Sequence, residues 1–167
     1  MSKVKPIPDG YHTVTPFLIV KQADKAIHFY KQAFGAEELE RHNAPDGKIM
    51  HALIKIGNSY VMLADEFPEY GCGASSPATL SGSSAVFHLY VEDVDSAFDQ
   101  AARAGAEITM PLMDAFWGDR YGQVKDPFGH FWSLATRKVN MAPEDLVQKG
   151  NECMTEKFSE KEHCMCK

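Results

Sequence analysis

Long apolar runs and blocks of basic residues are both missing from this 167-residue chain. A membrane-spanning helix needs about 20 consecutive predominantly apolar residues, and no segment approaches that length. The first six residues carry two lysines with no apolar stretch behind them, which does not fit a secretory signal. We therefore expect a cytoplasmic protein without a membrane partner.

An excess of positive charge is also missing, since 17 basic residues stand against 23 acidic ones for a net charge of −6. Nucleic-acid binding requires a basic surface that neutralises phosphates, so we expect no nucleic-acid partner. The hydrophobic content of 44% and charged content of 24% are typical of a globular protein. The length suits one domain, or two small modules that share a core.

Cysteine is scarce and unevenly placed. Cys72 lies in a Gly/Ser/Pro-rich stretch, and Cys153, Cys164 and Cys166 all lie in the last fifteen residues. This distribution does not predict the disulfide framework of a secreted fold. The three tail cysteines and His163 offer an alternative, a soft-metal site, but they lack the paired spacing of structural zinc sites. We interpret the tail as flexible and reduced.

The feature that the chain does contain is one motif written twice. Val20, Asp24 and Ala26 recur 71 positions later as valine, aspartate and alanine, and after a one-residue slip the match continues at an offset of 70. A nearly constant offset across some fifty residues indicates a repeat of one structural unit. The second set is Val91, Asp95 and Ala97.

Each copy predicts a strand, a helix and three further strands. The strands are rich in β-branched and aromatic residues, and apolar residues in the helices follow the i, i+3, i+4, i+7 spacing. Neither copy alone buries both faces of its sheet, so the copies must share a core. The predicted strands are 13–20, 38–41, 49–56 and 60–64, then 85–91, 107–110, 119–124 and 130–135; the helices are 23–34 and 94–104.

The repeat also predicts how the chain is divided. We expect an N-terminal arm at 1–10, a first βαβββ module at 11–66 and a second at 85–138. The stretch 67–84 is dense in Gly, Ser and Pro and is predicted to be a linker. Residues 139–167 are predicted to form a helical or frayed tail, because Pro143-Glu144-Asp145 resembles a helix start.

Four segments carry a resemblance to a known family. They read AIHFYKQAFG at 26–35, LYVEDVD at 89–95, WGDRYG at 117–122 and DPFGH at 126–130. With them the chain resembles the vicinal oxygen chelate superfamily of glyoxalases, bleomycin-resistance proteins and extradiol dioxygenases, in a PhnB-like, glyoxalase-like branch. The resemblance implies an α+β fold, in which tandem βαβββ modules with curved mixed sheets enclose a cavity, and a homodimer.

The resemblance also implies four metal-ligand positions, which hold His, Gln or Glu in metal-using members. They map to Thr15 and Met62 in the first module and to Val86 and Ser133 in the second. Zinc, nickel, manganese and iron prefer imidazole or carboxylate ligands. We therefore predict no cofactor at the usual centre, and a divalent metal would need a displaced site.

Strand alternation from these positions predicts the lining of the cavity. His51 and His88 are the candidate catalytic residues, although each is equally compatible with a structural histidine. Trp117 and Arg120 lie in a predicted loop that would close the mouth. The predicted ligand-binding residues are Thr15, Phe17, His51, Tyr60, Met62, Val86, His88, Trp117, Arg120, Tyr121, Phe131 and Ser133.

Three functions are compatible with this sequence. The first is a metal-independent protein that binds a small, partly hydrophobic organic ligand, since the predicted lining is aromatic with isolated polar groups. The second is a lyase, isomerase or dioxygenase with a displaced metal held by His51, His88 and Glu66. The third is a non-catalytic dimeric interaction module in which the dimer surface and the Cys/His tail matter more than the cavity.

Overall fold

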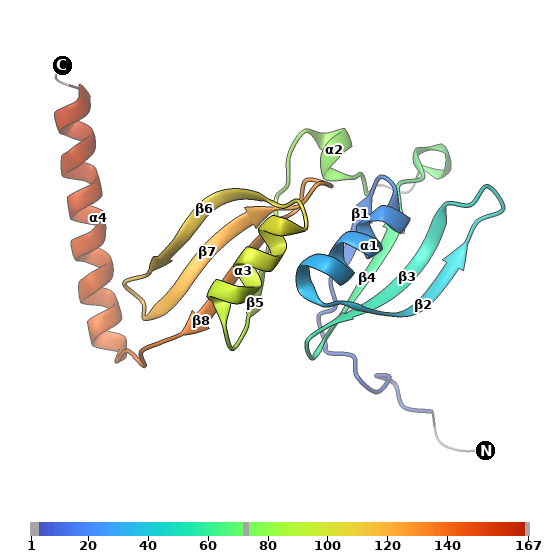
Figure 1. The fold of residues 1–167 in the computed structure, drawn as a ribbon, viewed down its shortest axis with the longest axis horizontal. Coiled ribbons are helices and arrows are strands. Elements are labelled where there is room, and N and C mark those ends of the chain that lie inside the picture. Colours follow the sequence, from blue (N-terminus) through green and yellow to red (C-terminus); the bar gives the residue numbers. More distant parts are fainter. Residues whose placement is uncertain (1–3, 72–73, 166–167) are drawn as a thin grey trace.

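Two four-stranded sheets, one from each half of the chain, form the framework of this computed structural model, which describes residues 4–71 and 74–165 (Figure 1). The first sheet has the order β1-β4-β3-β2 and the second the order β5-β8-β7-β6. In each sheet the first and last strands of the module run parallel and the other pairs are antiparallel. The strands are β1 (Phe17–Val20), β2 (Glu37–Asn43), β3 (Ile49–Ile56), β4 (Ser59–Asp65), β5 (Val86–Tyr90), β6 (Glu107–Asp114), β7 (Asp119–Lys125) and β8 (Phe131–Arg137).

The helices complete two βαβββ modules, which confirms the predicted α+β fold. Helix α1 (Ala23–Phe34) and strand β3 have the bounds predicted from sequence, and α3 (Val94–Arg103) ends one residue early. Strand β1 is shorter than predicted because Pro16, which has no amide hydrogen to donate, precedes it. Strand β6 is longer than predicted, since an edge strand tolerates Pro111.

The stretch between the modules contains two short elements, a 3₁₀ turn η1 (Pro68–Tyr70) and a helix α2 (Pro77–Leu80). Ser76 caps α2 by accepting a hydrogen bond from the backbone amide of Thr79. The carboxylate of Glu66 accepts hydrogen bonds from both hydroxyls, at 2.8 Å from Ser76 and 2.7 Å from Thr79. A segment predicted as a plain linker is therefore anchored to the end of β4.

The last strand of each module binds the first amide of that module's long helix, and in α3 the N-cap Asp93 also accepts from the amide of Ser96. Gln22 precedes α1 in a left-handed conformation (φ 65°) and its side chain makes no cap hydrogen bond. Asp65, at the end of β4, supplies the acceptor instead, and binds the amides of Ala23 and Ile49 at 2.8 Å each. Thr136, which lies 71 positions later on β8, accepts from the amide of Val94 at 2.9 Å. Asp65 and Thr136 therefore occupy equivalent positions of the repeat, and each binds a helix-start amide from a distant strand.

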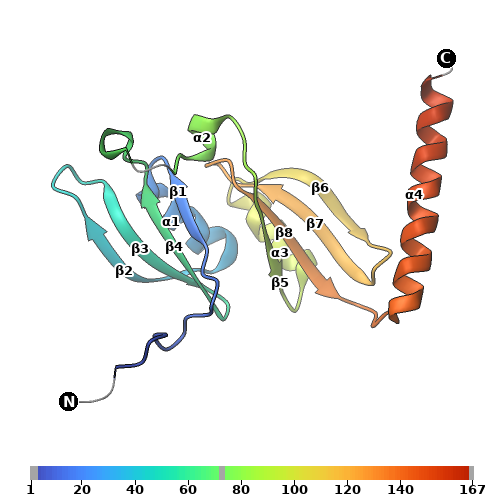
Figure 2. The same ribbon diagram turned by 180° about the vertical axis from the view of Figure 1, so that it is seen from behind.

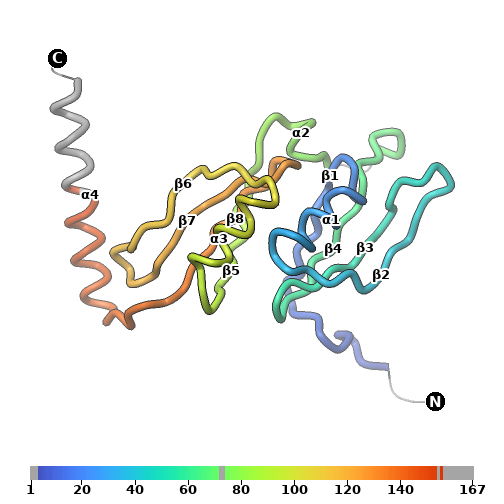
Figure 3. Tube along the Cα trace, viewed as in Figure 1, coloured from blue at the N-terminus to red at the C-terminus, as the bar shows by residue number. Residues whose placement is uncertain are grey.

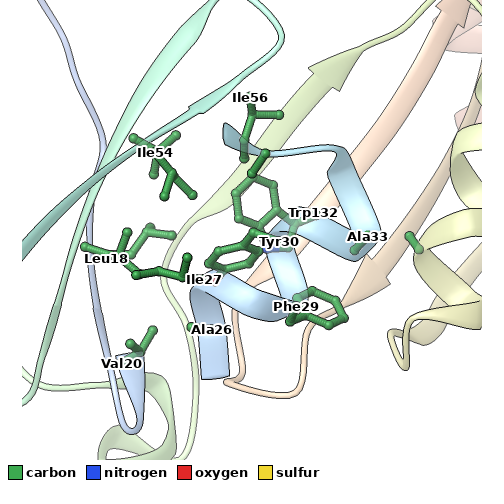
Figure 4. Close-up of a cluster of buried hydrophobic side chains, with 14 of the residues drawn as sticks. Leu18, Val20, Ala26, Ile27, Phe29, Tyr30, Ala33, Ile54, Ile56 and Trp132 are labelled. Atoms are coloured by element: carbon green, nitrogen blue, oxygen red, sulfur yellow. The ribbon is translucent and has the colours of Figure 1, made fainter. Parts of the chain in front are cut away.

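The modules meet through their helices, and one hydrophobic core runs across both (Figure 4). Tyr30 and Phe34 of α1 place their rings 5.4 and 4.8 Å from Trp132 of β8, centroid to centroid. Trp132 and Tyr30 are 1% and 0% exposed. Aromatic contacts at these distances add to the stabilisation from buried area, so neither module has a complete core without the other.

A buried carboxylate sits inside this junction. Asp126 accepts hydrogen bonds from the Tyr30 hydroxyl at 2.8 Å and from the Trp132 indole at 2.9 Å. Its other oxygen accepts from the backbone amides of Phe128 and His130, both at 2.9 Å. Burial and the carboxylate together raise the pKa of Tyr30 well above its usual value. The hydroxyl therefore stays protonated and joins the first module to the second.

The sheets are bare on the side that does not carry α1 and α3. In Figure 2 both helices lie behind the strands. Within the described residues, the most extensive contact between the modules joins α1 to α3. The sheet sides that face away from the helices therefore do not close over each other within one chain.

The long helix α4 (Pro143–Met165) stands beside the turn between β6 and β7 (Figure 3). Its contact with that turn is close, since a Cβ on Gly150 would lie 3.5 Å from the ring of Phe116. Cys153 is half-buried and its thiol is free. Cys72 and Cys166 lie outside the described residues, as do the side chains of His163 and Cys164. No helix in the described part of the chain is both long and apolar enough for a membrane span.

Replacing Asp65 should weaken the fold substantially. Asp65→Ala leaves two buried amides without an acceptor, and we expect a loss of about 2–4 kcal/mol in the free energy of unfolding. Urea denaturation measures this change. Asp99→Ala is the matched control, because Asp99 is an exposed aspartate on α3 and its loss should cost no more than about 0.5 kcal/mol. Equal effects of the two substitutions would show that the strand-supplied cap is unimportant.

Candidate functional site

Alternation along the strands divides each sheet into a helix-covered side and an open side. Leu18 and Val20 are buried under α1, whereas Phe17 is 52% exposed on the other side. The register extends this open side across the sheet, since Phe17 pairs with Met62 and Met62 pairs with Leu53. We call this side the first open face; it contains Phe17, Ile19, His42, His51, Leu53, Tyr60 and Met62.

The second sheet has a corresponding second open face. Val86 is 53% exposed and Tyr90 is 59% exposed, while Phe87 and Leu89 between them pack against the core. The register pairs Val86 with Phe131 and His88 with Ser133. The second open face contains Val86, His88, Tyr90, Tyr121, Phe131, Ser133 and Ala135. Most predicted ligand-binding residues thus lie on one open face or the other.

The second open face holds a histidine–serine pair. The Nδ1 atom of His88 lies 2.7 Å from the Ser133 hydroxyl, and the His88 ring is flanked by Tyr90 at 4.6 Å and Tyr121 at 6.1 Å. Partial burial lowers the pKa of His88, against a smaller opposing effect of Asp119. The imidazole is therefore neutral near pH 7; its Nδ1 pairs with Ser133, and Nε2 has no hydrogen-bond partner among the described residues.

A buried anion lies beside this pair. Asp119 is 2% exposed, and one of its oxygens accepts from the Tyr90 hydroxyl at 2.8 Å and from the Trp117 indole at 3.0 Å. Arg137 donates to the other oxygen at 3.1 Å. Asp119 and Arg137 were not predicted as site residues, because Asp119 sits next to a turn and Arg137 lies past the predicted end of its strand. The network fixes Tyr90 and Trp117 at the border of the face.

Aromatic and imidazole rings also line the first open face. His51 contacts Phe17 with ring centroids 5.9 Å apart, and its cross-strand partner is His42. The ring centroids of the two histidines lie 6.2 Å apart. Tyr60 meets Tyr11 edge to face at 5.0 Å. His42 was not predicted as a site residue, because it lies past the predicted end of its strand at Arg41.

Two predicted placements differ from the structure. Arg120 lies in β7 and not in a loop, and its guanidinium pairs with Asp95 of α3 at 2.8 Å, on the helix side of the sheet. The predicted metal trio is not brought together within one chain. His51 and His88 lie on different sheets, and Glu66 binds the two hydroxyls beside α2.

The four positions at which the resemblance implies metal ligands have no imidazole or carboxylate side chain. The Thr15 hydroxyl donates to the backbone oxygen of His12 at 3.3 Å, and Ser133 is held by His88. Met62 and Val86 offer no imidazole or carboxylate. Among the residues whose side chains the structure describes, no group of three or more His, Cys, Asp or Glu is arranged to hold a metal ion.

A groove of about 610 Å³ adjoins the second open face. It runs between the modules, and both His88 and Tyr90 line it together with Phe34, Ile56 and Gln100. Small-molecule sites of this volume typically combine apolar walls with a few polar groups. The groove meets that description, and it reaches His88 and also Tyr90, whose hydroxyl binds Asp119.

Comparison with known proteins identifies the class. The profile of the Glyoxalase/Bleomycin resistance protein/Dioxygenase superfamily matches residues 11–134. The chain belongs to this superfamily.

Particular relatives agree with that assignment. An uncharacterized protein of Mycobacterium tuberculosis H37Rv, Rv0887c, is 48% identical over 132 residues, which cover 77% of each chain. The crystal structure of TioX from Micromonospora sp. ML1 matches with a TM-score of 0.61 and 29% identity, over 75% of this chain and 98% of TioX. The PhnB protein of Bacillus cereus, at 20% identity, shares the fold with a TM-score of 0.57 over 75% of this chain and 99% of its own.

Stability should fall as the pH drops below about 6.5, the usual pKa of histidine. His130 is 6% exposed, and burial lowers its pKa more than the nearby Asp126 raises it. The unfolded chain therefore binds a proton at a higher pH than the folded chain. As the pH falls below the unfolded-state pKa of His130, protonation of this residue favours the unfolded chain. The contribution of the neutral His130 to the stability is fully present only above that pKa.

Urea denaturation between pH 8 and pH 5 measures this dependence. The substitution His130→Phe should flatten the slope between pH 6.5 and 5, because it removes the buried imidazole. His28→Ala, at an exposed position on α1, should keep the wild-type slope. An unchanged slope in His130→Phe would show that His130 does not cause the loss.

Proposed function

We propose that the protein is a homodimeric small-molecule-binding member of the superfamily, which holds an organic, partly aromatic ligand without the usual metal centre. In this proposal the first open face of one chain covers the second open face of its partner, and the reverse. The observation that carries the proposal is that the modules meet through α1 and α3, which leaves both ring-lined faces uncovered in one chain.

The exposure of large apolar side chains supports a second copy as the cover. Phe17, Val86 and Tyr90 are each more than half exposed on these faces, and Met110 and Met113 of β6 are 39% and 43% exposed. Contiguous exposed apolar patches mark interaction sites. In a two-fold dimer, the contact between the first open face of one chain and the second open face of the other occurs twice. One dimer interface would therefore cover all four open faces of the two chains.

The chemistry of the two faces indicates the type of ligand. Phe17 and Tyr60 offer flat apolar contacts on one side, and Phe131 and Tyr121 offer them on the other. The neutral His88, fixed by Ser133, supplies a directional hydrogen bond at Nε2. A compact ligand with one aromatic portion and one hydrogen-bonding group matches this lining. Such binding needs no metal, and Thr15, Met62, Val86 and Ser133 are poor ligands for one.

Disruption of a face should separate the dimer. Sedimentation of the wild-type protein should give a mass of twice the chain mass of 18.6 kDa. Val86→Glu should give the mass of a monomer, because it places a charge in the covered face. Leu80→Glu is the matched control, since Leu80 is 65% exposed on α2 and lies on neither open face. A monomeric wild-type protein, or a dimeric Val86→Glu variant, would contradict the proposed dimer.

The closed site should bind an aromatic probe. We expect 8-anilinonaphthalene-1-sulfonate to bind the wild-type protein and gain fluorescence, and His88→Ala to weaken this binding by about 2–10-fold, the equivalent of one lost hydrogen bond. His28→Ala should bind as the wild type does. The monomeric Val86→Glu variant should lose most of the signal. Equal binding by the wild type and both site variants would locate the probe elsewhere and refute the proposed site.

A further inference from the structure

We propose that the first open face carries a two-histidine site for a first-row divalent cation such as Zn²⁺ or Cu²⁺. The ligands are the imidazoles of His42 and His51, and Glu40 orients the His42 ring. The site does not depend on the dimer or on the organic ligand proposed above, since all three residues lie on two neighbouring strands of one chain.

The backbone places the two imidazoles side by side. His42 of β2 and His51 of β3 are direct partners across an antiparallel pair, which brings their Cβ atoms to about 4.5–5.5 Å. Their ring centroids lie 6.2 Å apart with an angle of 40° between the planes. Two imidazole nitrogens bound to one zinc ion at about 2.0–2.1 Å place the ring centroids about 5 Å apart. Small side-chain rotations, with no backbone movement, would bridge the difference.

Glu40 supplies the support that metal-binding histidines usually have. Its Oε1 atom lies 2.5 Å from Nε2 of His42. With the carboxylate of Glu40 on Nε2, Nδ1 is the ring nitrogen of His42 that is left to bind a cation. Carboxylate–histidine–metal arrangements of this kind raise the basicity of the ligand and orient its ring.

His51 has the complementary property of an uncommitted ring. Within the part of the chain that the structure describes, its ring nitrogens make no hydrogen bond, and its neighbours are the rings of Phe17 and His42. Packing against Phe17 restricts the ring without occupying a nitrogen. One imidazole is thus oriented by a carboxylate and the other by an aromatic contact, and each keeps a nitrogen for a cation.

The site differs from the positions of the superfamily's usual ligands. Those positions map to Thr15 before β1 and Met62 on β4, whereas His42 and His51 lie on the two strands beyond them, β2 and β3. Met62 pairs with Leu53, so His51 lies one strand across and two residues along from Met62, about 8 Å away, and His42 lies one strand farther, about 12 Å away. Two protein nitrogens leave coordination positions for water or a ligand oxygen, and imidazole favours zinc, copper and nickel. Because Glu40 stays hydrogen-bonded to His42, the site has two protein ligands. A site with two ligands is compatible with the finding that no three or more His, Cys, Asp or Glu side chains are grouped around a metal position among the described residues.

The experiment uses the full-length chain with its tail thiols removed, because the tail could bind the same ions. Zn²⁺ is titrated calorimetrically into Cys153→Ser/Cys164→Ser/Cys166→Ser protein, and the same background carries His42→Ala, His51→Ala or Glu40→Gln. His28→Ala and Glu37→Gln are the matched controls, an exposed histidine on α1 and an exposed glutamate on β2. Circular dichroism and thermal melting check that each variant folds.

We expect one equivalent of Zn²⁺ in the background protein, at least tenfold weaker binding in each histidine variant, and about tenfold weaker binding in Glu40→Gln. The controls should bind within twofold of the background. Unchanged affinity in either histidine variant, or no binding of the background protein below about 1 mM Zn²⁺, would overturn the site.

Copper provides a second readout that does not need the His51 variant to fold. The electron paramagnetic resonance spectrum of one equivalent of Cu²⁺ should show two coordinated imidazole nitrogens in the background protein and one in His42→Ala, whose side chain is 61% exposed in the wild type. The same nitrogen count in both proteins would contradict the proposal. Since His88 and Val86 are untouched, these outcomes are separate from those of the dimer and probe experiments.

Discussion

The buried carboxylate of Asp126 holds the two halves of this protein in one arrangement. It accepts a hydrogen bond from Tyr30 of the first module and three more from the second module, with both oxygens used. A buried carboxylate is tolerated only when such partners compensate for its loss of water. Because Tyr30 reaches it from the middle of α1, the helix must lie against β8, and the rings of Phe34 and Trp132 can then pack in a shared core.

That arrangement decides which surfaces remain available for function. With the helix-covered sides of both sheets used to join the modules, the two open faces are the surfaces left for a ligand or a second copy. The faces are chemically unequal. The second has a neutral His88 held by Ser133 and a buried Asp119, while the first has an aromatic patch beside the pair of His42 and His51. A space closed by one face of each kind would combine flat apolar walls with directional polar groups.

Much of the fold was predictable because the repeat places the same physical pattern twice. The bounds of α1 and β3 follow from apolar periodicity, and even the cap from Asp65 is repeated by Thr136. The site was less predictable. Strand alternation placed His88 and Ser133 together, but Arg120, which was expected at the mouth of the cavity, pairs with Asp95 on the helix side of the sheet. Register shifts near Leu39 and Asn43 decide which β2 residues oppose His51, and the single sequence contains no signal for such bulges.

The central claim is that unlike open faces of two chains lie against each other. Isotope-filtered nuclear Overhauser spectra of a dimer mixed from labelled and unlabelled chains test it most directly, since they report only contacts between copies. The account predicts contacts from Phe17 and Met62 of one chain to Val86 and Phe131 of the other. Contacts only between like faces, or none at these four residues in a folded protein, would contradict it.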